Sequence, residues 1–375
     1  MLTYLDRDLI RSFLIAFLVF MIFIQLGLFV SVLLDQFKYI FGEGESKLKW
    51  VLLYFVLGLP RHLAHTIPVA TAVTLLLVYT VKARQNEILA YLVGGVSPAR
   101  LAAPLLVCAL ILSGVAYATT ELVANDADAA AERIRKVHIE GRSMEAITRE
   151  KNVFQKGQGG RFYNVRSFRP LEKKMDLPII FQLSEDWGTT KWRLDAQGAE
   201  LVETPQGEQW RFRGVIYREF DKYGNVTSFV EKTEALETEV LPERLEAELG
   251  RYLQQRFRPS QMNSAELLEY IDLFRLQGKP TYELATHLHF NMALPLGCLV
   301  LACLMVGHIL RPASTGVLVG FGGGLIFVAL YYTILIAARE MSKSGAIWPP
   351  LGAHGVNVLF LVVALVMLNR NRMMR

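Results

Sequence analysis

Six long apolar runs constrain this chain more than any other feature of its sequence. A helix that crosses a bilayer needs about 20 mainly apolar residues, because about 30 Å of hydrocarbon is spanned at about 1.5 Å per residue. Six runs meet this requirement: Ile10–Leu34, Val51–Val81, Ala99–Val123, Ala285–Leu310, Gly316–Ala338 and Leu351–Leu368. Three precede a long polar region and three follow it. The sequence therefore predicts a polytopic α-helical membrane protein with an insert between its third and fourth spans.

Basic residues next to the runs indicate the orientation of the chain, because lysine and arginine gather on the cytoplasmic side. Nine of them lie on the side of both termini and five lie in the opposite short loops. This bias places both termini in the cytoplasm and the polar region outside. The first run lacks a small-residue cleavage site, so we expect it to remain a span. The net charge of +5 is mild and no basic–aromatic platform accompanies it, which argues against nucleic-acid binding.

The polar region has the pattern of an all-β domain over residues 137–250. Its segments are rich in aromatic and β-branched residues, and turn signals such as Gly224-Asn225 separate them. Short strands at this spacing predict a sandwich or a curved antiparallel sheet. The apolar positions change phase after Gly214, which suggests a bulge there. A capping box at Asn263–Glu266 then opens a connecting helix.

All three cysteines fall inside apolar runs, so the polar region is expected to fold without disulfides: Cys108, Cys298 and Cys303. The sequence contains no phosphate-binding loop, no HExxH and no GxSxG. The histidine pairs His62/His65 and His287/His289 each lack a third metal ligand of suitable spacing. We therefore expect neither a metal site nor catalysis. Two other classes stay open: a membrane-bound enzyme that acts on a lipid head group, and a membrane sensor with a ligand-binding β-domain.

One cation lies deep in an apolar run. Arg61 follows Trp50 by about ten residues, or roughly 15 Å of helix, and Pro60 and Pro68 bracket it. A cation there costs at least about 2.5 kcal/mol unless it meets water or a partner. It either lines a wet cavity that receives an anion or extends to the surface. Together with cations at the outer ends of spans one and three, it could bind a phosphorylated head group: Lys38, Arg61, Arg133, Arg135 and Lys136.

The fifth run carries a row of glycines on one helix face. Gly316, Gly320 and Gly324 recur every four residues, and such a face lets another helix approach closely. We expect a packing surface there, and its partner could belong to this chain or to another.

A short polar segment, "KARQNEILAYLVGGVSP" at residues 82–98, separates the second and third runs. About a dozen helical residues cannot cross a bilayer, so we expect a short cytoplasmic helix fixed to two spans. The helix either lies on the lipid surface or is a docking site for a partner protein, in which case Glu87 would face a cation of the partner. Four apolar side chains are expected on one stripe of this helix: Ile88, Leu89, Leu92 and Val93.

Taken in order along the chain, these features resemble the lipopolysaccharide export permease family, whose two related subunits form the membrane part of the Lpt-type ABC exporter. The resemblance covers nearly the whole chain and rests on the LDR opening, "ARQNEILAYLVGGVS", "HLHFNMALPLGCLVL" and "WPPLGAHGVNVLF". The LDR opening and Arg61 favour the G-type over the F-type sister subunit. Val32 departs from this pattern, since that subunit can carry a lysine there.

The resemblance implies a division into three parts. Residues 1–124 would hold spans one to three with a coupling helix at about 82–95. Residues 125–280 would form a periplasmic β-jellyroll-like domain with its connecting helix, and residues 281–375 would hold spans four to six. The coupling helix would dock into the ATPase through four positions: Arg84, Glu87, Leu89 and Gly95. The cations named above would face lipid A phosphates, and the fifth-span glycines would belong to a lateral gate.

The resemblance also implies a function and partners. The chain would be a permease subunit that extracts lipopolysaccharide from the bacterial inner membrane and passes it to periplasmic β-jellyroll bridge proteins for transport to the outer membrane. It would pair with a sister permease and with a cytoplasmic ATPase dimer. ATP and magnesium would bind to that dimer, so this chain is expected to bind no cofactor and to hold no catalytic residue.

Overall fold

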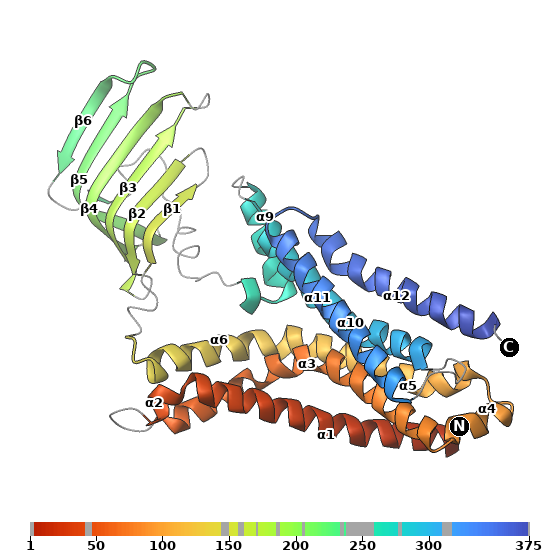
Figure 1. Ribbon diagram of the computed structural model, residues 1–375. Helices are drawn as coiled ribbons and strands as arrows, with labels where there is room; N and C mark the ends of the chain where they lie inside the picture. The colour runs from red at the N-terminus through yellow and green to blue at the C-terminus, as the bar shows by residue number, and fades with distance from the viewer. Residues whose placement is uncertain are drawn as a thin grey trace. The chain divides into compact units, whose positions relative to one another are not determined.

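The computed structural model describes residues 4–41, 47–143, 150–156, 161–169, 172–184, 188–204, 207–232, 236–237, 259–276, 280–309 and 317–373. The chain divides into two compact units, one made of Met1–Glu140 with Pro259–Arg375 and the other of Gly141–Arg258. The first unit is built from helices and the second from strands (Figure 1). This confirms a helical membrane protein with an all-β insert.

All six expected spans are helices. They are α1 (Tyr4–Asp35), α3 (Leu48–Arg84), α5 (Pro98–Thr119), α10 (Tyr282–Ile309), α11 (Val317–Lys343) and α12 (Pro349–Met373). Each is long and apolar enough to cross a bilayer. Shorter helices in the described part are α2 (Phe37–Phe41), α4 (Glu87–Val93), α6 (Asn125–Ile134) and α9 (Ser264–Leu276).

The centre of the helical unit lies between α3 and α10. In each of these helices 61% of the most apolar stretch is buried, against 17% for α1 and 22% for α11. Leu75 and Tyr79 of α3 share one core with Leu301 and Met305 of α10, and all four side chains are fully buried. α1 and α11 therefore lie at the periphery, where their exposed apolar side chains can face lipid or another chain.

Polar side chains inside this core bind to the backbone of α10 around Pro295. Ser113 Oγ donates a hydrogen bond to the Pro295 carbonyl, and Asn357 Nδ2 donates one to the Ala293 carbonyl, both at 2.9 Å. The hydroxyl of Tyr331 donates to Asn357 Oδ1 at 2.7 Å. Polar groups at membrane depth must be satisfied within the protein. These bonds therefore join α5, α11 and α12 to α10.

The third span extends well past its apolar run. α5 continues through a π-helical turn, η1 (Thr120–Ala124), then α6 and a second π-helical turn, η2 (Arg135–Ile139), as one long helix. The domain limit expected after residue 124 falls inside this helix, and the compact helical unit runs to Glu140. α6 packs on α3, and α9 packs on α10. Both segments flanking the insert therefore belong with the helices.

The described strands of the β unit form one antiparallel sheet. Its strands are β1 (Glu150–Lys156), β2 (Arg161–Arg169), β3 (Lys174–Leu183), β4 (Thr190–Thr204), β5 (Gly207–Phe220), β6 (Val226–Lys232) and β7 (Leu236–Glu237). β1 to β6 pair in sequence order, and β7 also pairs with β5. The described strands therefore form a meander. Of the two arrangements expected from the sequence, a sandwich and a single antiparallel sheet, they match the second.

The hairpin predicted at Gly224-Asn225 joins β5 to β6. Gly224 has a φ of +84°, which glycine adopts without a steric cost. The carboxylate of Asp221 accepts the N–H groups of Asn225 at 2.9 Å and Tyr223 at 2.8 Å. These bonds, the one from Asn225 first, hold the pKa of Asp221 below its usual value.

The phase change predicted at Gly214 is present, but it is not a bulge. Buried positions on β5 change from Phe212 to Val215, and on β4 they change from Ala196 to Ala199. The ladder between the two strands keeps one register across this point, because both strands shift together. Gly214 makes the shift with a φ of +60°. The four side chains stay in one core cluster, so the shift keeps them on one face of the sheet.

Candidate functional sites

The segment between α3 and α5 is a short helix bounded by two left-handed residues. Asn86 has a φ of +59° and Gly95 a φ of +84°. Asparagine and glycine are the residues that adopt this conformation most readily. α4 spans only seven residues, Glu87–Val93, because the left-handed turn at Asn86 ends α3 and starts a new helix. It is far too short to cross a bilayer.

α4 has one face toward the bundle and another facing outward. Ile88 is buried, and Leu92 packs against the same core. Leu89 is 56% exposed and Val93 is 81% exposed. The single stripe predicted for these four residues is therefore wrong, because successive residues lie about 100° apart around a helix. Leu89 and Val93 form an outward apolar pair, and Arg84 is exposed as well.

Glu87 is held within the chain by Lys82. Lys82 Nζ lies 2.7 Å from the Glu87 carboxylate and 2.6 Å from that of Asp8. The Lys82 side chain is only 8% exposed, whereas that of Glu87 is 38% exposed. Arg100, at the start of α5, pairs with the buried Asp6 at 2.7 Å. Acidic residues in the first turns of α1 therefore bind on both sides of the α4 segment.

The sequence pattern did not single out Asp6, Asp8 or Lys82 as functional residues. The partners are 74 positions apart in one pair and 94 in the other, so no local spacing reveals them. The only signal was the LDR opening, which contains Asp6.

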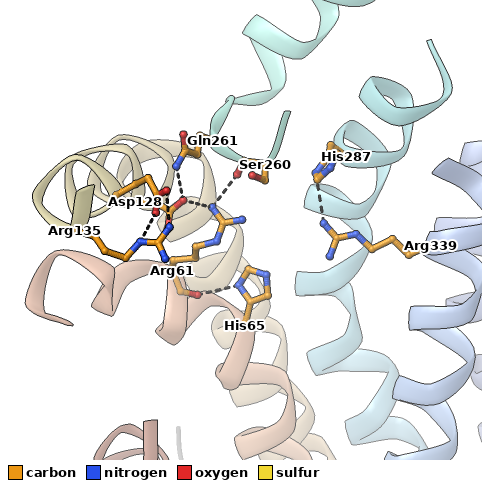
Figure 2. A network of polar contacts seen from close by, with 9 residues as sticks. Arg61, His65, Asp128, Arg135, Ser260, Gln261, His287 and Arg339 are labelled. Atoms are coloured by element: carbon orange, nitrogen blue, oxygen red, sulfur yellow. Dashed lines mark hydrogen bonds and ion pairs between the residues drawn. The ribbon is translucent and has the colours of Figure 1, made fainter. Parts of the chain in front are cut away.

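At the other end of the helical unit, Arg61 belongs to a hydrogen-bonded cluster (Figure 2). Its Nη1 lies 2.9 Å from Asp128 Oδ2 and 2.8 Å from the Ser260 carbonyl. Gln261 Nε2 donates to the same Asp128 oxygen at 3.0 Å. Arg61 is therefore a paired cation that joins α3 to α6 and to the segment that returns from the β unit.

The same return segment is bound a few residues later by Glu121. Its carboxylate accepts the backbone N–H of Ser264 at 2.9 Å and the hydroxyl of Ser264 at 2.7 Å. Asn263 and Glu266 exchange side-chain to backbone hydrogen bonds at 2.9 and 2.8 Å, which is the predicted capping box. α9 therefore begins where the sequence indicated.

The other cations predicted for a head-group site differ in their surroundings. Arg135 forms two hydrogen bonds with Glu132, at 3.0 and 2.8 Å, and Lys136 lies 3.1 Å from the same carboxylate. Arg133 and Lys38 are exposed, and Lys38 Nζ lies 4.8 Å from the centre of a tyrosine ring. The structure therefore neutralises three of the five predicted cations, counting Arg61, and leaves two without an acidic partner among the described residues.

A further cation at this end was missed by the sequence reasoning, which treated it only as a loop residue. Arg339 of α11 points toward α10, where its Nη2 lies 3.4 Å from His287 Nδ1 (Figure 2). Its buried Nε has no hydrogen-bond partner in the described part of the chain, and no described carboxylate lies within ion-pair distance. The neighbouring Glu340 pairs with Lys343 at 2.7 Å instead. Arg339 is thus a partly buried cation that has no carboxylate within ion-pair distance among the described residues, although Glu340 beside it in the chain acts on it from farther away.

A family model for the lipopolysaccharide export system permease LptF/LptG matches residues 7–370. The chain belongs to this family. No curated protein matches it. The resemblance seen in the sequence is confirmed, as is its coarse consequence that the chain is a multi-pass permease subunit rather than an enzyme. The family model covers the F-type and the G-type subunit alike, so the preference for the G-type stays a prediction.

The fifth-span glycines of this permease have different neighbours. A Cβ added at Gly324 would lie 2.5 Å from Leu76 Cδ1, so α3 of the same chain approaches closely there. No described residue has an atom within 4 Å of such a Cβ at Gly320, and Gly316 lies outside the described residues. The glycine face is therefore closed within this permease at Gly324 and open at Gly320.

The histidines singled out in the sequence contact other residues of the helical unit. His65 Nδ1 lies 2.9 Å from the Arg61 carbonyl, and the ring of His289 meets that of His354 edge-on at 5.6 Å. Among the residues that the structure describes, no three His, Cys, Asp or Glu side chains are grouped as metal ligands would be.

Proposed function

We propose that this permease extracts lipopolysaccharide from the bacterial inner membrane and passes it to periplasmic bridge proteins. The observation that carries the proposal is the family match over residues 7–370. Both termini and α4 would lie in the cytoplasm and the β unit in the periplasm, in line with the bias of basic residues. A sister permease would pack on α1 and α11, the two least buried spans.

ATP hydrolysis would take place in a cytoplasmic ATPase dimer that binds α4 and holds ATP and magnesium. Leu89 and Val93 offer an apolar centre for this contact, and Glu87 and Arg84 offer charges at its edge. An apolar centre with a polar rim is the usual anatomy of a protein interface. Gly95 would let the chain turn directly into α5. Because short connections fix α4 to α3 and α5, its movement would be passed to both spans.

The phosphates of the lipid would be bound at the end of the helical unit that holds Arg61 and Arg339. We call it the insert end, because the chain leaves it for the β insert and returns to it. Arg339 is the strongest candidate, because an incoming anion would stabilise a partly buried guanidinium that forms no ion pair with any carboxylate that the structure describes. His287 lies beside it, and the exposed Arg133 and Lys38 are also open to an anion. The three paired cations would bind phosphate only by exchanging their carboxylate partners: Arg61, Arg135 and Lys136.

Purification of the chain with its partners tests the proposed function. We expect the tagged chain to carry a sister permease, an ATPase and lipopolysaccharide from the membrane. Glu87→Lys should lower the amount of bound ATPase by at least about tenfold, because it puts a cation where a partner cation is expected. Glu283→Lys is the matched control, since Glu283 is an exposed carboxylate at the start of α10. The proposal is wrong if the chain carries no ATPase or if Glu87→Lys retains it fully.

A further inference from the structure

Acidic residues at the start of α1 hold the α4 segment on both sides. Asp8 pairs with Lys82 before α4, and Asp6 pairs with Arg100 after it. Lys82 also reaches Glu87 on α4 itself. We call this group the clasp: Asp6, Asp8, Lys82, Glu87 and Arg100. Through the clasp, α1 is a third span connected to the α4 segment, although the chain joins only α3 and α5 to it directly.

The packing of α1 gives this connection a mechanical consequence. Its buried side chains form one stripe that ends at Met21: Asp6, Leu9, Phe13, Phe17 and Met21. From residue 22 to residue 35 no side chain of α1 is buried. The contacts there include a hydrogen bond of 3.1 Å from Gln25 to Thr66 and a ring contact of 4.9 Å between Phe29 and Phe55. α1 is therefore packed firmly over its first half and more loosely over its second, so a displacement at Asp8 would tilt the second half.

The charges of the clasp leave Glu87 able to accept a second cation. Lys82 faces two carboxylates, so the triad of Asp8, Lys82 and Glu87 has one more negative than positive charge. Glu87 is the more exposed end of its pair with Lys82. A partner cation at Glu87 would offset the surplus without releasing Lys82 from Asp8. Docking on α4 would therefore leave the clasp closed.

We propose that the clasp couples α4 to α1, so that a movement imposed on α4 is passed to span one as well as to spans two and three. The inference rests on the proposed docking of an ATPase at α4. Asp8 and Lys82 are positioning residues in this scheme. Lys82 fixes the carboxylate of Glu87, and Asp8 links Lys82 to α1, while neither needs to touch lipopolysaccharide or the ATPase.

Asp8→Asn tests the clasp in the complete exporter. The amide keeps the shape of the side chain but loses the negative charge that attracts Lys82, which stays paired with the Glu87 carboxylate. In proteoliposomes containing lipopolysaccharide, we expect ATP hydrolysis close to that of wild type. Lipopolysaccharide released per ATP should fall about two- to fivefold, the range that one partly exposed ion pair supports. The nucleotide-driven change in distance between spin labels at Phe23 and Leu351, both exposed, should shrink in parallel.

Two further variants control this experiment. Arg7→Gln removes an exposed charge that stands between Asp6 and Asp8 and has no partner among the described residues, so it should change neither readout. Lys82→Arg keeps a cation between the two carboxylates and should preserve both readouts.

The outcomes of these experiments distinguish a failure of the proposed coupling through the clasp from a failure of the proposed ATPase docking at α4. A wild-type release ratio and a wild-type distance change in Asp8→Asn would overturn the clasp, even where Glu87→Lys abolishes ATPase binding. Disassembly of the Asp8→Asn exporter would also overturn it, because the ion pair would then be needed for assembly rather than for coupling. Intact ATPase binding in Glu87→Lys would show that the docking itself is wrong.

Discussion

The enclosed cations at the two ends of the helical unit differ in how completely carboxylates neutralise them. At the α4 end, Lys82 lies between two carboxylates and Arg100 is paired with Asp6. At the insert end, Arg61 has one carboxylate, and Arg339 has none in the part of the chain that the structure describes. A cation whose counter-charges are already bound gains little from a further anion, whereas one without them is stabilised by it. The enclosed cations of the α4 end therefore link helices, whereas Arg339 at the insert end is open to a ligand.

Arg61 is the intermediate case, and it shows what divides the two roles. It contributes to the fold by joining α3, α6 and the return segment at Ser260. Its side chain and that of Asp128 are nevertheless 25% and 27% exposed, so a phosphate could reach the pair and compete for the guanidinium. Counter-charge and access, more than the presence of an arginine, decide which role a cation has.

The largest effect is expected where the cation is most enclosed. Lys82→Met removes the ammonium between two carboxylates and leaves Asp8 and Glu87 facing each other. Because the ammonium is enclosed but both carboxylates are partly exposed, its removal should lower the free energy of unfolding by about 2–3 kcal/mol, less than a fully buried pair would lose. The midpoint of thermal unfolding of the purified protein in detergent measures this loss.

Arg84→Met is the matched control for Lys82→Met. Arg84 lies two positions further on, is exposed, and should change the free energy of unfolding by no more than about 0.5 kcal/mol. If both variants lose the same free energy of unfolding, the pairing of Lys82 with Asp8 and Glu87 does not stabilise the fold, and the proposed difference between the two ends is wrong.

A smaller effect is expected at Arg61. Arg61→Gln loses the ion pair with Asp128 and the hydrogen bond to Ser260, which should lower the free energy of unfolding by about 1–2 kcal/mol. Hydrogen exchange should speed up in residues 259–264, because the return segment loses one of its attachments. Arg133→Gln, at an exposed neighbouring cation, should leave both measurements unchanged. An unchanged exchange rate in Arg61→Gln would show that Arg61 does not hold the return segment in place, and would leave ligand binding as its one proposed role.

Local features of this permease could be predicted from its sequence because each depends on a few consecutive residues. Hydropathy over about 20 residues is enough to place a span. The hairpin at Gly224 and the capping box at Asn263 follow from turn and cap chemistry within four positions, and both are present. The family resemblance added the transport role, which no spacing of residues in this chain shows.

Contacts between distant positions could not be predicted, and they decide the candidate sites. Arg61 meets Asp128 across 67 positions and Ser260 across 199, so the sequence showed a cation but not its counter-charge. The face of α4 was misassigned for a related reason. α4 has two adjacent apolar pairs, Ile88 with Leu92 and Leu89 with Val93. Which pair is buried depends on the helices that pack against α4, and in the structure Ile88 is buried while Leu89 is exposed.

Arg339 should have the smallest effect on stability, and it is the sharpest test of the contrast between the two ends. Arg339→Gln removes a partly buried charge with no described carboxylate, so the free energy of unfolding should stay within about 0.5 kcal/mol of wild type or rise. Photocrosslinking of the purified exporter to lipopolysaccharide should fall about tenfold, as expected for the loss of a charge-assisted hydrogen bond to phosphate. The prediction is wrong if Arg339→Gln loses as much stability as Arg61→Gln and crosslinks as well as wild type. Arg339 would then be held by a stabilising partner, as Lys82 is held by its two carboxylates.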